Sequence, residues 1–352
     1  MSLSPVAHDP SVAEDGDTSP TELGRKTRER LDANVLVDCE GGKRNVSPLE
    51  QRDMIPKVVH FIYLGGRPFS LTHMLAVLSA QIVNGPDSII LHCSEMPVGP
   101  WWERIAPLVT INHVSRPNEV FGRPVKMLAH MADVIRLRVL KEQGGIYLDL
   151  DVICVNPFDS LLGNTFVMGI EPGTGLCNAV ILAAKGAPFI DRWFDEYRTF
   201  DAENWNFHSV VLPSRLAIQF PDEIQIQDKY AFFYPSHNDP VHSILWGKSP
   251  DMYASGWRMS KNAVRLLQYA VQGRHTVFSK AHYGTFHHLR SGQWHMQRLR
   301  DAFCLHLWES LWHGPYLSKV DRDFLLESPV PFAALMRDVF GRDRLSEMTS
   351  PP

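Results

Sequence analysis

The sequence predicts an α/β fold with a largely parallel central sheet, and three observations support this. Apolar runs typical of buried strands lie at residues 56–64, 88–94 and 108–114. A segment with helical periodicity, 71–84, separates the first two runs. A second helical segment precedes another apolar run, GGIYLDLDV, at 144–152. Strands that alternate with helices at this spacing are typical of βαβ units, which build parallel sheets.

The helix before GGIYLDLDV has recognisable ends. Pro124 is expected in its first turn, and Gly144-Gly145 is expected to end it. Further along the chain the alternation weakens. Residues 166–171 and 178–185 are predicted to be strands, and 188–200 an amphipathic helix. From residue 201 the chain is richer in Trp, His and Pro and shows no sustained periodicity.

Composition places the chain among globular proteins. Its 352 residues are 44% hydrophobic and 21% charged, with a formal net charge of −4. This balance lacks the basic footprint of a nucleic-acid binder, so no nucleic-acid partner is expected. No run approaches the ~18–20 consecutive apolar residues of a membrane span, so no integral membrane segment is expected.

The N-terminus and the cysteines together favour a cytoplasmic protein. Residues 1–53 begin without the basic start and apolar centre of a signal peptide, and their polar composition predicts a disordered tail. The five cysteines are scattered and odd in number, and they match neither a zinc spacing nor a disulfide framework. This usage favours a reducing compartment.

Two carboxylates, Asp149 and Asp151, interrupt the apolar run 144–152. In a continuous strand they would share one face with Tyr147, about 7 Å apart. Two such charges are costly in an apolar core. A divalent cation would balance them, since Mg²⁺ and Mn²⁺ take carboxylate and phosphate oxygens. The alternative is a strand end at which two solvated acids flank a turn.

The preceding helix contributes a second charged pair. Asp133 and Arg136 stand at i and i+3 within a segment that is apolar around most of its circumference. They could simply pair with each other. A buried pair beside a second acidic site could also bind a polar ligand, such as a diphosphate-linked sugar.

Three segments in this order resemble the DXD-type sugar-transferring glycosyltransferases. They are IPKVVHFIYLGG (55–66), ADVIRLRVLKEQGGIYLDLDV (132–152) and NAVILAAKG (178–186). That family includes Golgi-type mannosyl- and α-1,4-glycosyltransferases and bacterial polysaccharide enzymes, with the clostridial toxin glucosyltransferases as distant relatives. The resemblance covers residues 55–200 well and the C-terminal part weakly.

The resemblance implies a GT-A fold with a Rossmann-like sheet, helices on both of its faces and a C-terminal α+β part. Residues 54–200 would bind the nucleotide sugar, and 201–352 would bind the acceptor within the same catalytic domain. Tyr63 matches the aromatic residue that stacks on the donor base, where Trp is usual. Core packing is the other interpretation of Tyr63.

The family pattern also implies roles for the polar residues. Asp133 and Arg136 match the pair that contacts the donor sugar. Asp149 and Asp151 match the DXD motif, in which the second acid ligates the metal and the first reaches the ribose or the metal through water. Asn178 matches a polar residue beneath the donor and acceptor sugars, with a turn Asn as the alternative.

The C-terminal segment AFCLHLWESLW (302–312) resembles the His-x-Trp close of the α-1,4-transferase branch. It suggests His306 as a metal contact and Trp308 near the diphosphate. FHHLRSGQW (286–294) is a rival segment, with His287 or His288 in the metal role. An ordinary hydrogen-bonded histidine is the alternative for each of them.

The sequence thus predicts a retaining glycosyltransferase dependent on Mn²⁺ or Mg²⁺. It would move a hexose from a UDP- or GDP-linked sugar to a hydroxyl acceptor in a glycan, a lipid or a small natural product. Asp149, Asp151 and Arg136 are the predicted catalytic residues. Two other readings stay open: a toxin-like enzyme that glycosylates proteins, and a catalytically silent protein that binds sugar nucleotides.

Overall fold

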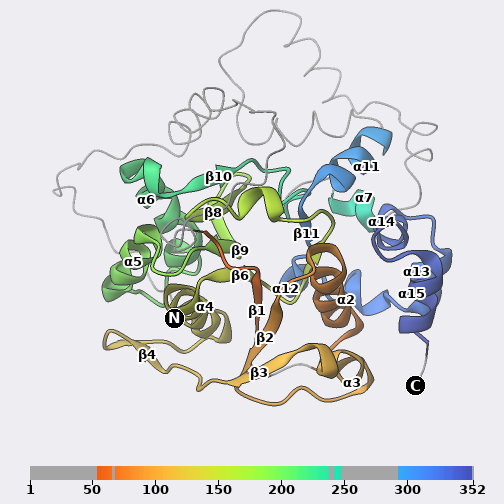
Figure 1. The fold of residues 1–352 in the computed structure, drawn as a ribbon, viewed down its shortest axis with the longest axis horizontal. Helices are drawn as coiled ribbons and strands as arrows, with labels where there is room; N and C mark the ends of the chain where they lie inside the picture. Colours follow the sequence, from red (N-terminus) through yellow and green to blue (C-terminus); the bar gives the residue numbers. More distant parts are fainter. Residues whose placement is uncertain (1–53, 66–67, 238–241, 247–291, 351–352) are drawn as a thin grey trace, which may run out of the picture. The chain divides into compact units, whose positions relative to one another are not determined.

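A seven-stranded sheet forms the centre of the computed structural model, in the order β10-β8-β9-β6-β1-β2-β3 (Figure 1). The structure describes residues 54–65, 68–237, 242–246 and 292–350, which belong to one compact unit. The strands of this sheet are β1 (Val58–Tyr63), β2 (Ser88–Cys93), β3 (Thr110–His113), β6 (Gly145–Leu148), β8 (Phe166–Glu171), β9 (Gly175–Ala183) and β10 (Gln225–Gln227). All of its strand pairs are parallel except the two made by β9, which runs antiparallel to β6 and β8. The predicted α/β fold with a mostly parallel sheet is confirmed.

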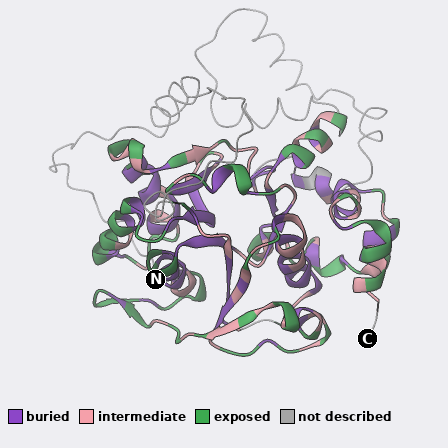
Figure 2. Cartoon of the chain, in the orientation of Figure 1, coloured by how far each residue is buried: buried purple, intermediate pink, exposed green. Residues whose placement is uncertain are grey.

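Helices cover both faces of this sheet. They are α2 (Leu71–Ser79), α3 (Pro100–Ile105), α4 (Leu128–Gln143), α5 (Pro188–Asp195), α6 (Leu212–Gln219), α7 (His242–Trp246), α11 (Gly292–Asp301), α12 (Glu309–Trp312), α13 (Arg322–Glu327), α14 (Pro331–Phe340) and α15 (Arg342–Met348). Alternate side chains of β1 enter two separate cores. Phe61 packs with α2, α3 and the C-terminal helices, whereas Ile62 packs with α4, α5 and α6. The central strands are therefore buried almost throughout (Figure 2).

Helix α4 begins later than the sequence predicts. Pro124 lies in β5 (Arg123–Pro124), which pairs antiparallel with β4 (Glu119–Val120), and the helix starts at Leu128. Phe121 and Gly122 form the tip of this hairpin with φ of 48° and 75°. A proline fits such an edge because it has no ladder N–H to lose. The predicted C-terminal stop is confirmed, since Gly144 caps the helix and its N–H donates to the Leu140 carbonyl.

The other predicted elements lie close to their expected positions. The helix predicted at 71–84 is α2 followed by a π-helical turn, Ala80–Asn84. The helix predicted at 188–200 is α5 followed by a 3₁₀ turn, Glu196–Thr199. Beyond residue 201 the structure has several short helices, which no periodic pattern in the sequence predicts.

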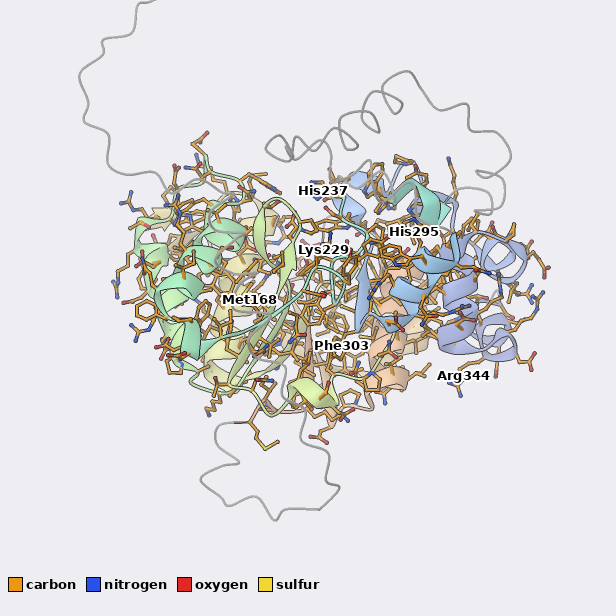
Figure 3. The ribbon with its side chains drawn as sticks, turned by 90° about the horizontal axis from the view of Figure 1, so that it is seen from above. Met168, Lys229, His237, His295, Phe303 and Arg344 are labelled. Atoms are coloured by element: carbon orange, nitrogen blue, oxygen red, sulfur yellow. The ribbon has the colours of Figure 1, made fainter. Side chains whose placement is uncertain are left out.

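Two strands from beyond residue 201, β10 and β11 (Cys304–His306), pair with strands that come earlier in the chain. Strand β10 joins the central sheet, and β11 pairs antiparallel with β7 (Val152–Cys154), which follows β6. The Val155 N–H donates to the carbonyl of Phe303 at 2.8 Å. Figure 3 labels Phe303. Residue 306 is thereby brought beside residue 151. The boundary predicted at residue 200 stays a prediction, and the predicted tail 1–53 lies outside the described residues.

In the part of the chain that the structure describes, no helix combines the length and the apolar character that crossing a bilayer requires.

Candidate metal and donor site

Asp149 and Asp151 lie in a turn at the carboxyl end of β6. The strand ends at Leu148, and β7 begins at Val152. The Val152 N–H donates to the Asp149 carbonyl at 3.0 Å and closes the turn. The prediction of a continuous strand through both acids is therefore wrong. The turn frees the two carboxylates from the strict alternation of a strand, so that both can face one point at the ligand-binding edge of the sheet.

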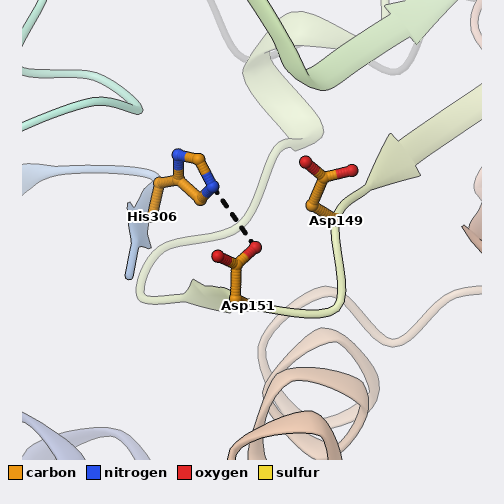
Figure 4. Close-up of side chains that lie close together, drawn as sticks. All are labelled: Asp149, Asp151 and His306. Atoms are coloured by element: carbon orange, nitrogen blue, oxygen red, sulfur yellow. Dashed lines mark ion pairs between the residues drawn. The ribbon is translucent and has the colours of Figure 1, made fainter. Parts of the chain in front are cut away.

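Asp149, Asp151 and His306 form a candidate metal site (Figure 4). One ligand atom from each residue lies within 4.8 Å of the other two. His306 Nε2 is 3.2 Å from Asp151 Oδ1, and the β7–β11 pairing holds the two residues together. Two carboxylates and an imidazole suit Mn²⁺ or Mg²⁺, whose coordination a substrate diphosphate would complete. These residues therefore fit a hard divalent cation.

The electrostatics of this group favour a bound positive charge. Burial opposes the ionisation of Asp151, but His306 and the backbone N–H of Glu309 hold the pKa of Asp151 at about 2. Burial would lower the pKa of His306, yet the Asp151 carboxylate raises it above the ordinary value. Burial raises the pKa of Asp149 despite the nearby Arg136 guanidinium. His306 thus acts as the counterion of Asp151, a role that a cation could take over.

Arg136 links α4 to the Asp149 turn. Its Nη1 is 3.2 Å from Asp149 Oδ1, and its Nη2 is 3.3 Å from Asp133 Oδ1. Nη1 also donates to the Asn178 carbonyl at 2.7 Å, and the Asn178 amide donates to Asp133 Oδ1 at 2.7 Å. The Tyr147 hydroxyl donates to Asp149 Oδ1 at 2.5 Å. The pair predicted at i and i+3 is therefore formed, but it belongs to a network that includes the DXD turn.

Within this network the exposed fraction of the side chains increases from α4 to the DXD turn. The side chains of Arg136 and Asp133 are 6% and 9% exposed, whereas that of Asp149 is 27% exposed. Although burial disfavours its charge, the Asp149 carboxylate raises the pKa of Arg136, which stays protonated. A permanent positive charge therefore lies directly behind the most accessible carboxylate.

Residues 106–167 match the family model described as "Glycosyltransferase sugar-binding region containing DXD motif". The matched range contains the whole of α4 and the whole Asp149 turn. Over these residues the chain is similar to the DXD-motif glycosyltransferases.

Curated proteins are similar to parts of this chain. Glucan organizing enzyme 1 of Cryptococcus neoformans var. grubii is 37% identical over 230 residues, which are 60% of this chain and 63% of that protein. Inositol phosphoceramide mannosyltransferase 3 of Schizosaccharomyces pombe is 44% identical over 59 residues, 17% of each chain. Subversion of eukaryotic traffic protein A of Legionella pneumophila is 36% identical over 70 residues, 18% of this chain and 11% of that protein. The chain thus spans less than two thirds of each of these relatives.

Solved structures of glycosyltransferases are similar at low sequence identity. PaToxG glycosyltransferase has a TM-score of 0.36 at 21% identity, over 48% of this chain and 71% of that chain. The galactosyltransferase LgtC, in complex with donor and acceptor sugar analogues, has a TM-score of 0.36 at 12% identity, over 84% and 97%. GlyE of Streptococcus pneumoniae has a TM-score of 0.37 at 12% identity, over 84% and 65%.

Of the two predicted aromatic contacts, Trp308 lies beside His306, and Tyr63 packs against Phe69. Tyr63 ends β1 and is 8% exposed, and its ring meets Phe69 edge-on at 5.9 Å. The Trp308 ring lies 4.1 Å from that of His306, and its indole N–H donates to the Pro235 carbonyl at 3.2 Å. The rival metal ligands, His287 and His288, lie outside the described residues.

A cavity of about 450 Å³ lies between the start of α2, the start of α3 and the segment after α12. Its lining includes Phe69, Ser70, Val98, Trp101, His313 and Val320. Phe69 contacts Tyr63, and His313 Nδ1 is 3.4 Å from a carboxylate oxygen of Glu309, whose N–H binds Asp151. The cavity therefore extends from the end of β1 toward the segment after His306.

Sequence reasoning missed two carboxylates near the DXD turn. Glu171 ends β8 and is 5% exposed; the Thr174 hydroxyl donates to it, and His237 Nδ1 lies 3.4 Å away (Figure 3 labels His237). An acid at the carboxyl end of a buried strand is the signal that could have identified it. Glu309 contacts Asp151 through its backbone N–H at 2.7 Å, and a backbone contact leaves no mark in the sequence.

Proposed function

We propose that this chain is a retaining, cation-dependent glycosyltransferase. It transfers a hexose from a UDP- or GDP-linked sugar to a hydroxyl acceptor, with Mn²⁺ or Mg²⁺ as cofactor. One observation carries the proposal: the ligand atoms of Asp149, Asp151 and His306 lie within 4.8 Å of one another, with Arg136 paired to Asp149 behind them. Two acids, an imidazole and a buried guanidinium suit a diphosphate that is bound through a cation.

The donor is proposed to lie along the carboxyl edge of the sheet. Its nucleoside would occupy the cavity beside Phe69, with the base near Tyr63. Asp133 and Asn178, which are 6% and 7% exposed, would face the transferred sugar. Ligands of open α/β sheets bind at this edge, which supports the assignment.

The reaction needs stabilisation of negative charge more than it needs a covalent intermediate. The cation, when bound, would offset the charge that develops on the departing diphosphate. Arg136 holds Asp149 in place and adds a fixed positive charge. The bond between the anomeric carbon and the diphosphate oxygen breaks, and its electron pair goes to that oxygen. The acceptor oxygen bonds to the same face of the sugar, and its proton goes to the leaving phosphate oxygen.

The name of one similar protein guides the choice of acceptors. A relative is named as an inositol phosphoceramide mannosyltransferase, which makes GDP-mannose and lipid acceptors worth including in any assay. A cytoplasmic location is supported by the four described cysteines, which are all free thiols and buried.

The test is a donor panel with matched variants of the purified chain. UDP- and GDP-sugars are incubated with Mn²⁺, with and without glycan, lipid and protein acceptors. We expect turnover of one donor to be lost in the double variant Asp149→Asn/Asp151→Asn and kept in Asp191→Asn, an exposed acid paired with Lys141. Transfer only to protein would favour the toxin-like alternative, and binding without turnover would favour the silent one. Metal-dependent turnover that survives the double substitution would exclude the proposed site.

A further inference from the structure

Asp151 is held by the last residue of β11 and by the segment that follows this strand. His306 Nε2 lies 3.2 Å from Asp151 Oδ1, and the Glu309 N–H donates to Asp151 Oδ2 at 2.7 Å. The Leu307 N–H also donates to the Asp151 backbone carbonyl at 2.9 Å. One carboxylate oxygen is thus committed to a backbone donor, and the other faces the imidazole.

This geometry depends on an unusual backbone conformation. Trp308 has φ 54° and ψ 49°, the left-handed region that a residue with a bulky side chain rarely adopts. The turn at Trp308 directs the next N–H, that of Glu309, toward Asp151. Such a conformation persists only where surrounding contacts impose it.

The side chain of Glu309 supplies one of those contacts. Its Oε2 is 3.0 Å from His73 Nε2, and the side chains are 16% and 6% exposed. His73 Nδ1 accepts the Ser70 N–H in the capping box of α2. Because Nδ1 is an acceptor there, the ring proton sits on Nε2 and is donated to Glu309. A chain of contacts therefore runs from the start of α2 through Glu309 to Asp151.

We propose that Glu309 is a positioning residue for the DXD site. His73 anchors the Glu309 side chain and thereby fixes the start of α12. The Glu309 N–H then holds one carboxylate oxygen of Asp151 and leaves the other oxygen for a divalent cation. Glu309 would not itself touch the cation, because its carboxylate is not among the three ligand groups that converge. Contacts one shell outside a metal commonly orient its ligands in this way. The inference rests on the proposed function, since it assumes a cation at Asp151.

The closing experiment measures Mn²⁺ binding to the full chain by electron paramagnetic resonance, with and without UDP or GDP. We expect Glu309→Ala and His73→Leu each to weaken Mn²⁺ binding about 10- to 100-fold. Glu309→Gln, whose amide oxygen still accepts from His73, and His73→Gln, whose amide still donates, should stay within about 3-fold of the unsubstituted chain. Glu327→Ala, a matched exposed glutamate paired with Arg342, should bind like the unsubstituted chain.

Two further variants separate the possible failures. The pair Glu309→Ala/His73→Leu should bind no more weakly than Glu309→Ala, because His73 acts through Glu309. Asp151→Asn should abolish binding. If Asp151→Asn binds as well as the unsubstituted chain, or if that chain binds no Mn²⁺, the proposed function and this inference both fail. Only the positioning role is wrong if Asp151→Asn abolishes Mn²⁺ binding while Glu309→Ala and His73→Leu leave it intact. The same conclusion follows if the losses of Mn²⁺ affinity from Glu309→Ala and His73→Leu add up in the double variant. If Glu309→Ala does not fold, the Leu and Gln variants of His73 decide the question.

Discussion

Arg136 and Asp149 form an ion pair that joins the long helix α4 to the DXD turn, with Nη1 3.2 Å from Oδ1. The guanidinium is almost fully buried, whereas the carboxylate is 27% exposed. The same guanidinium pairs with Asp133 and donates to the Asn178 carbonyl. The buried Arg136 guanidinium thus holds residues of α4, the DXD turn and β9 in place, and these residues are proposed to bind the donor.

Loss of Arg136 should therefore damage both stability and activity. Arg136→Met leaves Asp133 and Asp149 without their shared cation, and breaking a buried pair costs about 3–5 kcal/mol. Arg136→Lys should recover part of that stability but little of the activity, because an ammonium cannot reproduce the forked contacts. Urea unfolding measures the first effect and donor turnover the second. Arg138→Met, two residues along the same helix, is the control; equal losses from both arginines would refute the role given to Arg136.

Two buried tyrosines should respond differently to loss of their hydroxyl groups. The Tyr147 hydroxyl donates to Asp149, so Tyr147→Phe should lower the free energy of unfolding by about 1–2 kcal/mol. The Tyr197 hydroxyl is buried without a hydrogen-bond partner among the described residues, so Tyr197→Phe should be neutral or slightly stabilising. Chemical denaturation of both variants checks this. The opposite ranking would show that the hydroxyl of Tyr147 is not part of the network.

A buried chain of polar groups crosses the sheet away from the DXD turn. His60 Nε2 lies 2.9 Å from the Gly144 carbonyl, which can only accept, so the proton of His60 sits on Nε2. His60 Nδ1 then accepts from His92 Nε2 at 3.0 Å, and His92 Nδ1 accepts from Asn112 at 2.9 Å. The bonds accepted by His60 Nδ1 and by His92 Nδ1 require that these two nitrogens carry no proton.

Acid should therefore destabilise the fold through these histidines. Burial lowers the pKa of His60 from 6.5 to about 4, so the unfolded chain binds more protons between these values. The free energy of unfolding should then fall as pH drops from 6.5 toward 4, by up to ~1.4 kcal/mol per pH unit for one histidine. His60→Gln should reduce this slope, whereas His113→Gln, on the exposed end of β3, should not. A slope that is unchanged in His60→Gln would contradict the neutral chain.

The junction between α4 and β6 should accept no side chain. Gly145 has φ 112°, and a Cβ there would lie 2.7 Å from both His60 Nε2 and the Val58 carbonyl oxygen. Gly145→Ala should therefore cost about 2 kcal/mol or more, from backbone strain and displacement of His60. Gly163→Ala, with open space around it, is the matched control. Thermal unfolding of both variants gives the comparison, and similar melting temperatures would show that the junction yields more easily than its geometry implies.

The sequence alone predicted the parts of this structure that depend on local pattern. Apolar runs predicted β1, β2 and β3, because buried strands consist largely of apolar residues. Gly144 predicted the end of α4, because glycine is common where helices end. The spacing of Asp133 and Arg136 predicted their pairing. The carboxylates of the DXD turn predicted a charged site, and the resemblance to the glycosyltransferases added His306, which the structure brings beside them.

Contacts between segments that are distant in the sequence could not be predicted from the sequence. Pro124 fits a helix start and a hairpin edge equally well, and only the pairing with Glu119 decides between them. Glu309 and Asp151 are 158 residues apart in the sequence, and the hydrogen bond between them has a backbone N–H as its donor. Any residue type can supply such a donor, so the sequence does not predict this bond. The turn through Asp149 and Asp151 was missed because its neighbours are all strand-forming residues.

The most direct test of the central claim is the position of Mn²⁺ in crystals soaked with the ion and a nucleoside diphosphate. An anomalous difference map should show one strong peak within about 2.0–2.3 Å of carboxylate oxygens of the DXD turn and of His306 Nε2. A peak bound elsewhere, or no peak while the nucleotide is bound, would contradict a metal site built from Asp149, Asp151 and His306.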